Sequence, residues 1–434
     1  MHSIPAFLHS EFRLNLLSFA GNGMQEPVNY IILAIPVFFL LIGMEIIFDR
    51  LRKSGYYRLN DTISNINAGI AEQVTGVFFK VVVIGAYLWV YEYVRVATIP
   101  NNIFTWVLLF IGIDFFYYWF HRLAHEVNVL WGGHVVHHQS EEYNLSVALR
   151  QGAFQKFGSF AFYLPLALLG FDPIMFIVIS QWQTIYQFWI HTKVIDKLHP
   201  VAEFILNTPS HHRVHHGRNP IYIDRNHGGT LIIWDRLFGT FQEELEPVVY
   251  GITTPLETWN PIRAQIDIWR DMGKAIRKAN GWKHKAGILF RQPGWYPEEL
   301  GGPIRPQPVD RQSIVKFDVA IPYWLHRYVL VQFLLILSLA SYFLFTFESF
   351  PAWQQGLMAG MVIYSITAVG WLLELHRNSS WMETIRQVAN VAMAILLMQS
   401  KLWSLSVGGG VILLSVAGGI WFLTKQKHLR YGVE

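Results

Sequence analysis

The chain has 434 residues, of which 52% are hydrophobic and 15% are charged; because a soluble globular chain usually carries about 25% charged residues, lipid is expected around part of it. The net charge is only +4 and the basic residues are scattered, so a nucleic-acid surface is not expected. The chain has no cysteine, which excludes disulfides, a thiol nucleophile and thiolate-bound iron, so any metal must be held by nitrogen and oxygen.

The first apolar run, residues 30–48, reaches the roughly 20 residues that a membrane-spanning helix needs. It lies behind a mixed segment containing Glu11 and Arg13, so we expect a retained span and not a cleavable signal peptide. A hairpin is expected to turn at Asp172-Pro173. Including the two arms of this hairpin, the further expected apolar segments are residues 74–94, 103–120, 157–171, 174–190, 328–345, 353–373, 388–398 and 405–423.

Basic residues suggest how the chain is oriented in the membrane. Arg50, Arg52 and Lys53 directly follow the first span, and the positive-inside rule places this loop in the cytoplasm. Counting spans from there brings the ends of the third span and of the hairpin, at His121 and His191, to the same face. We therefore expect the histidine-rich segments to lie on the cytoplasmic face.

The chain beyond the hairpin is more polar up to about residue 325 and is expected to form a cytoplasmic cap. The predicted fold is an all-α, polytopic membrane helical bundle with a histidine-rich metal-binding cap and additional C-terminal transmembrane helices. Three regions are expected: residues 1–120 with the first spans, residues 121–325 with the histidines, and residues 326–434 with the last spans.

Histidine is concentrated in one part of the chain, where twelve of the 18 histidines fall between His121 and His227. Three groups have the spacing HxxxH or HxxHH, which places their imidazoles on one face of a helix. One more histidine stands at the end of the hairpin, and His211 is a weaker tenth candidate. The nine expected metal ligands are His121, His125, His134, His137, His138, His191, His212, His215 and His216.

Imidazole nitrogen suits zinc, iron, copper or nickel, and one ion rarely takes more than about four to six protein ligands. The number of candidate histidines therefore predicts a site for two ions. His199 and His227 lie near the groups but lack their spacing. A lone histidine of this kind is more often a hydrogen-bonded or surface side chain, so both are left out of the expected site.

Three polar residues near the histidines are candidates for catalytic roles. Asp114 lies two turns before His121 within an apolar span and could accept a hydrogen bond from a ligand histidine, or pair with another polar residue of the spans. Glu126 adjoins His125 and could be a metal ligand, a proton carrier or a capping acid on a solvated face. Asn207 could bind metal through its amide oxygen, although Asn-Thr-Pro-Ser is also typical of a turn.

The histidine groups resemble the histidine boxes of the fatty acid hydroxylase and sterol desaturase superfamily, and Trp-Asp-Arg-Leu-Phe-Gly-Thr at residues 234–240 resembles its closing signature. Within the superfamily, residues 115–126, 142–151, 186–192 and 207–219 are most similar to the alkylglycerol monooxygenase family. Weaker similarity covers nearly the whole chain. These motifs are highly specific.

The resemblance implies a di-iron mixed-function oxidase that uses O₂ to hydroxylate the ether-bearing carbon of an alkylglycerol, with tetrahydrobiopterin as reductant. The product would then fall apart to a fatty aldehyde and a glycerol derivative. The family's box histidines match the nine expected ligands, whereas the chain departs from the family pattern at His199 and His227. The reductant is expected at the cap or at the box loops, near Glu126.

Two other functions remain open. A sterol or fatty acid hydroxylase or desaturase, supplied with electrons by a protein donor, would use the same histidine boxes. A membrane metal transporter or storage protein would use the histidines as transit ligands, but the expected groups lie at span ends on one face and do not line a path across the bilayer. Product formation from a lipid ether would distinguish the three functions.

Overall fold

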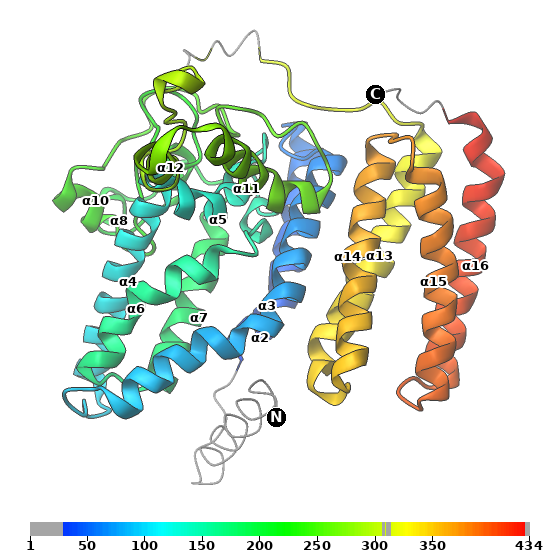
Figure 1. The fold of residues 1–434 in the computed structure, drawn as a ribbon, viewed down its shortest axis with the longest axis horizontal. Coiled ribbons are helices and arrows are strands. Elements are labelled where there is room, and N and C mark those ends of the chain that lie inside the picture. Colours follow the sequence, from blue (N-terminus) through cyan, green and yellow to red (C-terminus); the bar gives the residue numbers. More distant parts are fainter. Residues whose placement is uncertain (1–28, 306–308, 310–313, 430–434) are drawn as a thin grey trace.

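The structure is a computed structural model, and it describes residues 29–305, 309 and 314–429 (Figure 1). The described part of the chain is built from helices, and its only strand-like pairings are two isolated β-bridges. The expected all-α fold is therefore confirmed. Residues 1–28 of the expected first region lie outside the described residues.

The first half of the molecule is a group of long helices. They are α2 (Tyr30–Arg52), α3 (Leu59–Tyr93), α4 (Ile103–Glu126), α6 (Gln155–Leu169) and α7 (Pro173–Trp189), with the shorter α5 (Asn128–His138) and the 3₁₀ turn η1 (Val147–Leu149). α4 packs against α5, α6 and α7, while α3 packs on α6 and α2 on α7. α4 runs without a break through the boundary expected at residue 120, so the division into three regions remains a proposal.

The α6–α7 hairpin turns where the sequence predicts. Gly170 ends α6 in the left-handed region, at a φ of 99°, which glycine adopts without steric cost. The Asp172 side chain accepts the backbone N–H groups of Ile174 and Met175 and so caps α7, whose first residue is Pro173.

In the part of the chain that the structure describes, five helical segments are long and apolar enough to cross a membrane: Tyr30–Arg52, Ile103–Glu126, Tyr323–Ser349, Ala352–Leu373 and Leu405–Lys425. α3, which bends by 43°, would be a sixth. The multi-pass membrane character is confirmed, although not every expected apolar segment is long and apolar enough. The two arms of the hairpin are only 15 and 17 residues long. α15 (Ser379–Gln399) begins nine residues before the span expected there and carries Glu383 and Arg386 in its first half.

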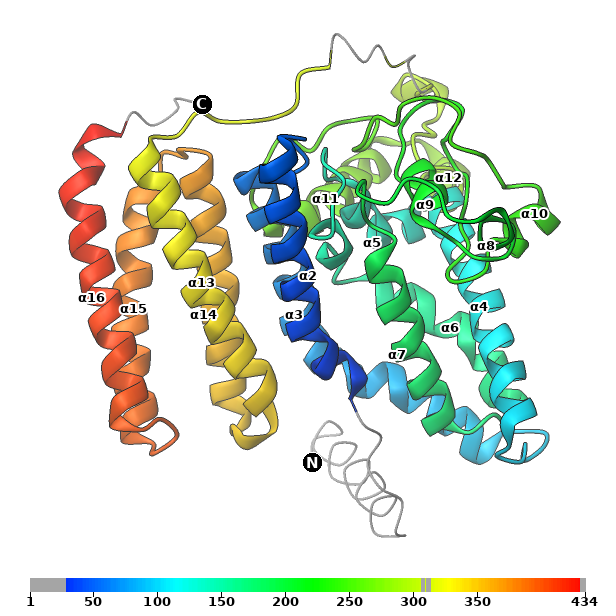
Figure 2. The same cartoon turned by 180° about the vertical axis from the view of Figure 1, so that it is seen from behind.

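Short helices of the middle region form a cap over one end of α4 to α7 (Figures 1 and 2). They are α8 (Pro200–Ile205), α9 (Pro209–His215), α10 (Ile233–Phe238), α11 (Pro261–Lys278) and α12 (Gly281–Phe290). The cap packs onto the helices below it, as α11 contacts both α3 and α5. The expected cap is present, and it covers the end of α4 at which His121 and His125 lie.

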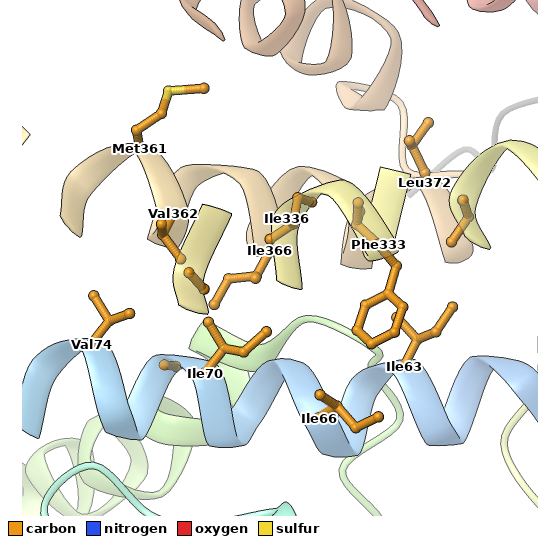
Figure 3. Close-up of a cluster of buried hydrophobic side chains, with 14 of the residues drawn as sticks. Ile63, Ile66, Ile70, Val74, Phe333, Ile336, Met361, Val362, Ile366 and Leu372 are labelled. Atoms are coloured by element: carbon orange, nitrogen blue, oxygen red, sulfur yellow. The ribbon is translucent and has the colours of Figure 1, made fainter. Parts of the chain in front are cut away.

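The C-terminal helices α13 (Tyr323–Thr346), α14 (Ala352–Leu373), α15 and α16 (Leu405–Lys425) stand beside the first half (Figure 1). The two parts meet along α3. Figure 3 shows Ile63, Ile66 and Ile70 of α3 facing Phe333 of α13 and Ile366 of α14, and all five side chains are buried in one hydrophobic cluster. α3 therefore joins the histidine-bearing half to the C-terminal bundle through apolar packing.

A buried polar network lies inside the C-terminal bundle. Arg386 Nε and Nη2 donate to the two Glu383 carboxylate oxygens at 2.8 and 2.6 Å, and Nη2 also donates to Gln332 Oε1 of α13 at 2.6 Å. Gln387 Nε2 donates to Glu383 Oε1 at 2.7 Å. A Cβ at Gly418 of α16 would lie 2.9 Å from Gln332 Nε2, so a larger residue there would require the Gln332 side chain to shift.

Replacing Arg386 with methionine is expected to lower the thermal unfolding midpoint of the detergent-purified protein. The Glu383 carboxylate would lose its ion-pair partner in a buried site, and breaking such a pair typically costs about 3–5 kcal/mol. Arg377→Met is the matched control, because the Arg377 side chain is exposed. Equal melting temperatures for the two variants, measured by circular dichroism, would show that the network contributes little to stability.

Candidate metal centre

The nine histidines expected to bind metal come together in the structure. α4 supplies two of them, α5 supplies three, one follows the end of α7, and α9 with its C-cap supplies three. None of the nine is more than 7% exposed. Their nitrogen atoms form two compact groups, within each of which the candidate ligand atoms lie within 4.8 Å of one another. The first group is His121, His125, His134, His138 and His215, and the second is His137, His191, His212 and His216.

Backbone carbonyl groups fix the orientation of several of these rings. Four Nδ1 atoms lie 2.7–2.9 Å from a carbonyl oxygen: His121 from His227 O, His137 from Arg150 O, His191 from Gln187 O and His215 from Arg225 O. A carbonyl oxygen can only accept a hydrogen bond, so each of these Nδ1 atoms carries the ring proton. In the neutral imidazole, Nε2 then carries an unshared electron pair.

The Nε2 atoms point toward one another. In the first group, the Nε2 atoms of His121 and His138 each lie 3.0 Å from His134 Nε2. In the second group, His137 Nε2 lies 3.2 Å from His191 Nε2 and 3.1 Å from Nε2 of His216.

Electron pairs at this separation repel each other unless a proton or a cation lies between them. His121, His137 and His191 already carry their proton on Nδ1. Nε2 of His125 and His215 is buried without any hydrogen-bond partner. Both groups therefore have the donor arrangement that fits a metal cation.

The protonation state of the histidines also suits metal binding. Burial lowers the pKa of His134 and His191 to about 4. Burial, followed by the neighbouring histidines, lowers the pKa of His212 and His216 well below the ordinary value of 6.5. These rings are therefore neutral at physiological pH, which is the form that binds metal.

The two groups adjoin each other. The ring of His138 in the first group lies 4.4 Å from that of His216 in the second, centroid to centroid, and the rings of His212 and His215 lie 5.1 Å apart. Each HxxHH motif contributes to both groups, because His137 and His138 are consecutive, as are His215 and His216. The arrangement can hold two ions side by side.

His227 lies beside the first group, although sequence reasoning left it out. Its side chain is fully buried, its ring centroid lies 5.1 Å from that of His125, and neither ring nitrogen has a hydrogen-bond partner. The position follows from Asp235, whose carboxylate accepts the backbone N–H groups of His227 and Gly228 at 2.7 Å. Asp235 belongs to the Trp-Asp-Arg-Leu-Phe-Gly-Thr signature, and this proximity is the one sequence signal that could have identified His227.

Of the two roles left open for Asp114, the structure shows contacts with other polar groups and not with a ligand histidine. Its two oxygens accept the side-chain N–H groups of Gln183 and Trp234 and the backbone N–H groups of Thr230 and Leu231, at 2.7–3.1 Å. The contact with Gln183 of α7 agrees with the second alternative, pairing with another polar residue of the spans, and the four donors saturate the carboxylate. Asp114 instead anchors the loop that follows His227, whose carbonyl oxygen orients His121.

The other expected polar residues lie around the histidine groups. The Glu126 side chain accepts a hydrogen bond from Arg122 Nε at 2.9 Å and is 29% exposed, as expected for an acid on a solvated face. Asn207 Nδ2 donates to Gly228 O at 2.6 Å, and Asn207 Oδ1 is buried without a partner. Catalytic roles for Glu126, Asn207 and Asp114 remain proposals.

The two remaining histidines near the cluster lie outside both groups. His211 Nε2 lies 3.1 Å from a carboxylate oxygen of Glu203. His199 is exposed and caps α8, where its ring accepts a backbone N–H. Both positions fit structural roles.

A cavity of about 540 Å³ leads from the cap to the histidines. Its walls come from α5, α11 and the loops around residues 217–224, 251–256 and 292–304, and its lining includes His125, His138, His215 and His216. Asp224 also lines it, with a carboxylate oxygen 3.7 Å from His125 Nδ1. Burial and the neighbouring Glu126 raise the pKa of Asp224 to about 6. The cavity gives a small molecule access to the two histidine groups from the cap.

The purified protein is expected to hold two metal ions per chain. His125→Ala removes a ligand from the first group and His191→Ala removes one from the second, so each variant should lose about one ion. Mass spectrometric metal analysis after expression in iron-supplemented medium measures this, with His284→Ala as control, because His284 is 45% exposed and pairs with Glu299. A wild-type protein that retains at most one ion would contradict a two-ion site.

Comparisons with known proteins agree with this geometry. A family model described as fatty acid hydroxylase matches residues 106–240. The chain is 40% identical to alkylglycerol monooxygenase of Homo sapiens over 84% of this chain and 82% of that protein, and 39% identical to the Xenopus tropicalis protein over 84% and 81%. It is also 32% identical to an ornithine lipid hydroxylase of Rhizobium tropici, over 32% of this chain and 43% of that one.

No solved structure matches the chain. The identity to the human and frog proteins extends far beyond the histidine motifs, and the histidine groups lie inside the matched fatty acid hydroxylase region. The chain therefore belongs to the alkylglycerol monooxygenase family, whose members are membrane lipid monooxygenases of the fatty acid hydroxylase superfamily.

Proposed function

We propose that the chain is a di-iron monooxygenase that hydroxylates the ether-linked carbon of alkylglycerols. One oxygen atom of O₂ enters the C–H bond and the other leaves as water, while a reductant supplies two electrons and two protons. The hydroxylated ether then breaks down to a fatty aldehyde and a glycerol derivative. The observation that carries the proposal is the pair of adjoining histidine groups with converging Nε2 atoms, in a chain 40% identical to human alkylglycerol monooxygenase over most of its length.

Iron bound in the two groups would supply an oxidant strong enough for an unactivated C–H bond, which side chains alone cannot supply. The chain's own contribution is to hold the histidine rings in position and to shield the site from bulk water. The Nδ1–carbonyl hydrogen bonds fix the ring planes, and the near-complete burial of the nine histidines excludes bulk water. Asp114 and Asp235 hold the loop of residues 227–234 against α4, which keeps the His227 carbonyl oxygen on His121.

We assign the reductant, a tetrahydrobiopterin, to the cavity under the cap. The cavity reaches four ligand histidines from the side of the cap, whereas an ether lipid keeps its tail in the membrane. Trp131 offers a flat aromatic surface, and the carboxylate of Asp224 can accept hydrogen bonds from ring N–H groups. Glu126, near which the reductant is expected from the sequence, lies close enough to Asp224 to raise the pKa of that carboxyl, which supports this assignment.

The assay for this function is aldehyde release from a one-chain glyceryl ether by iron-loaded protein. Aldehyde should form with O₂ and tetrahydrobiopterin, should be lost without a reductant, and should be absent for His137→Ala. Asp224→Asn should raise the KM for tetrahydrobiopterin several-fold and leave the KM for the lipid unchanged. The matched control is Asp196→Asn, because Asp196 is 98% exposed.

Two outcomes of this assay would change the assignment. Hydroxylation of a sterol or a free fatty acid, without any aldehyde from the ether, would move the chain to the sterol and fatty acid hydroxylase branch and leave the metal site intact. If the ether is turned over with a protein electron donor but not with the pterin, the assignment of the pterin to the cavity would be wrong, while the assignment of the substrate would stand.

We also propose that the cap and the histidines face the cytoplasm. Arg50 and Arg52 stand in the last turn of α2, at the end of the helix nearer the cap, as the positive-inside rule requires for a cytoplasmic cap. Since the chain lacks cysteine, single cysteines test this directly. A cysteine replacing Lys278 should react with a membrane-impermeant reagent only after the cells are opened, whereas one replacing Thr98, in the loop at the far end of α4, should react in intact cells. The reverse pattern would contradict the proposed orientation.

A further inference from the structure

Two helices of the cap expose apolar side chains and no charged ones. The exposed residues of α8 and α10 are Pro200, Val201, Phe204, Ile205, Leu237 and Phe238. Val201 is 60% exposed, Phe204 59% and Leu237 65%. We refer to these six residues on α8 and α10 as the α8–α10 wedge. A contiguous apolar surface of this kind marks contact with a protein or a membrane.

The neighbouring cap helix α11 has the opposite surface. Its exposed residues are Arg263, Ile266, Arg270, Asp271, Lys274, Arg277 and Lys278, and six of these seven are charged. Apolar exposure is therefore not a general property of the cap. α12 also exposes apolar side chains, Trp282 by 74% and Phe290 by 65%, but together with Lys283 and Lys285, whereas α8 and α10, on one side of the cap, expose no charged side chain (Figure 1).

Contacts inside the wedge hold the two short helices together. Ile232 N donates to Ile205 O at 3.0 Å, and Leu206 and Leu231 form an isolated β-bridge. The side chain of Arg236 in α10 contacts α8, because its Nε donates a hydrogen bond to Phe204 O at 3.2 Å. The one basic side chain of the two helices is thus bound to the protein, which leaves the outer surface apolar.

The wedge continues a surface of α4 that faces lipid. α4 belongs to the membrane-crossing helices and exposes Phe104 and Leu108, by 81% and 56%. Near the cap, the ring centroid of Trp119 lies 5.0 Å from that of Phe238 of α10. Figures 1 and 2 both show α10 beside the cap end of α4, level with the upper turns of the C-terminal helices. The wedge therefore lies at the level of the cap-side ends of the candidate membrane spans.

We propose that the α8–α10 wedge is inserted into the membrane, at the boundary between lipid headgroups and acyl chains. The occupant of this surface is lipid, because the wedge is continuous with the lipid-facing side of α4 and carries no exposed charge. Phenylalanine and leucine on one face of short helices are typical of segments that lie in the plane of this interface.

The insertion has a consequence for substrate access. α8 lies in the chain between His191 and His212, which both belong to the second histidine group. An inserted wedge brings lipid next to the two segments that carry these ligands. Alkyl chains would then approach the second group from the bilayer, while the cavity approaches the first group, and His216 of the second, from the cap.

Single cysteines in the cysteine-free chain test the insertion without measuring activity. Phe204→Cys and Leu237→Cys are labelled with a small fluorophore, and the purified protein is placed in phosphatidylcholine vesicles with and without lipids that carry a spin label near the headgroup. Both labels should be quenched by these lipids as strongly as a label at Leu108→Cys on the lipid-facing side of α4. A label at Lys278→Cys on α11 is the water-facing control and should be quenched by dissolved iodide instead.

Two results would overturn the proposal. Quenching of the wedge labels by iodide, as at Lys278→Cys, would show that the wedge lies in water. Protection from both quenchers would show that a protein surface, such as a second copy of the chain, covers the wedge. Neither result bears on lipid ether oxidation, which the aldehyde assay tests separately.

Discussion

The hydrogen bonds between histidine Nδ1 atoms and backbone carbonyl oxygens are the interaction on which the site depends. They assign the ring proton to Nδ1 and leave Nε2 as a lone-pair donor in both groups. The acceptors are carbonyl groups of residues 150, 187, 225 and 227, so the fold must hold three separate stretches of backbone against the rings. Asp114 and Asp235 hold the loop that contains the His227 carbonyl group, and the helical backbone of α7 holds the Gln187 carbonyl group against His191.

The membrane-spanning helices supply only some of the histidines of the site, and α5 and the cap supply others. α4 carries His121 and His125 out of the bilayer-crossing part, and the cap closes over them with α9. α3 ties this half to the C-terminal bundle through the packing of Ile63 and Ile70 (Figure 3). The buried Glu383–Arg386 pair lies well away in α15, so the bundle has its own polar core. The buried ion pair of the C-terminal bundle and the histidine groups of the first half thus lie in different parts of the molecule.

Much of this arrangement could be predicted from the sequence, because helical spacing alone brings the histidines of each motif to one face. The Asp172-Pro173 turn was predictable for the same reason, since local chemistry decides it. His227 lacks the helical spacing of the motifs, and its place depends on a loop contact with Asp235 and on the left-handed residues Asp224 and Asn226 before it. The contacts of Asp114 could not be predicted from the sequence either, because its hydrogen-bond donors lie 69 to 120 residues away along the chain. α8 and α10 are only six residues long, too short to show a periodic pattern.

Neither histidine group contains a carboxylate. Uncharged ligands leave the positive charge of a bound ion without a counter-charge, and burial keeps water from screening it. Imidazole ligation of this kind favours the lower oxidation state, as replacement of thiolate by histidine does in iron–sulfur centres. Iron bound by these ligands would therefore be held more readily in the ferrous form, and a modest electron donor would suffice to reduce it.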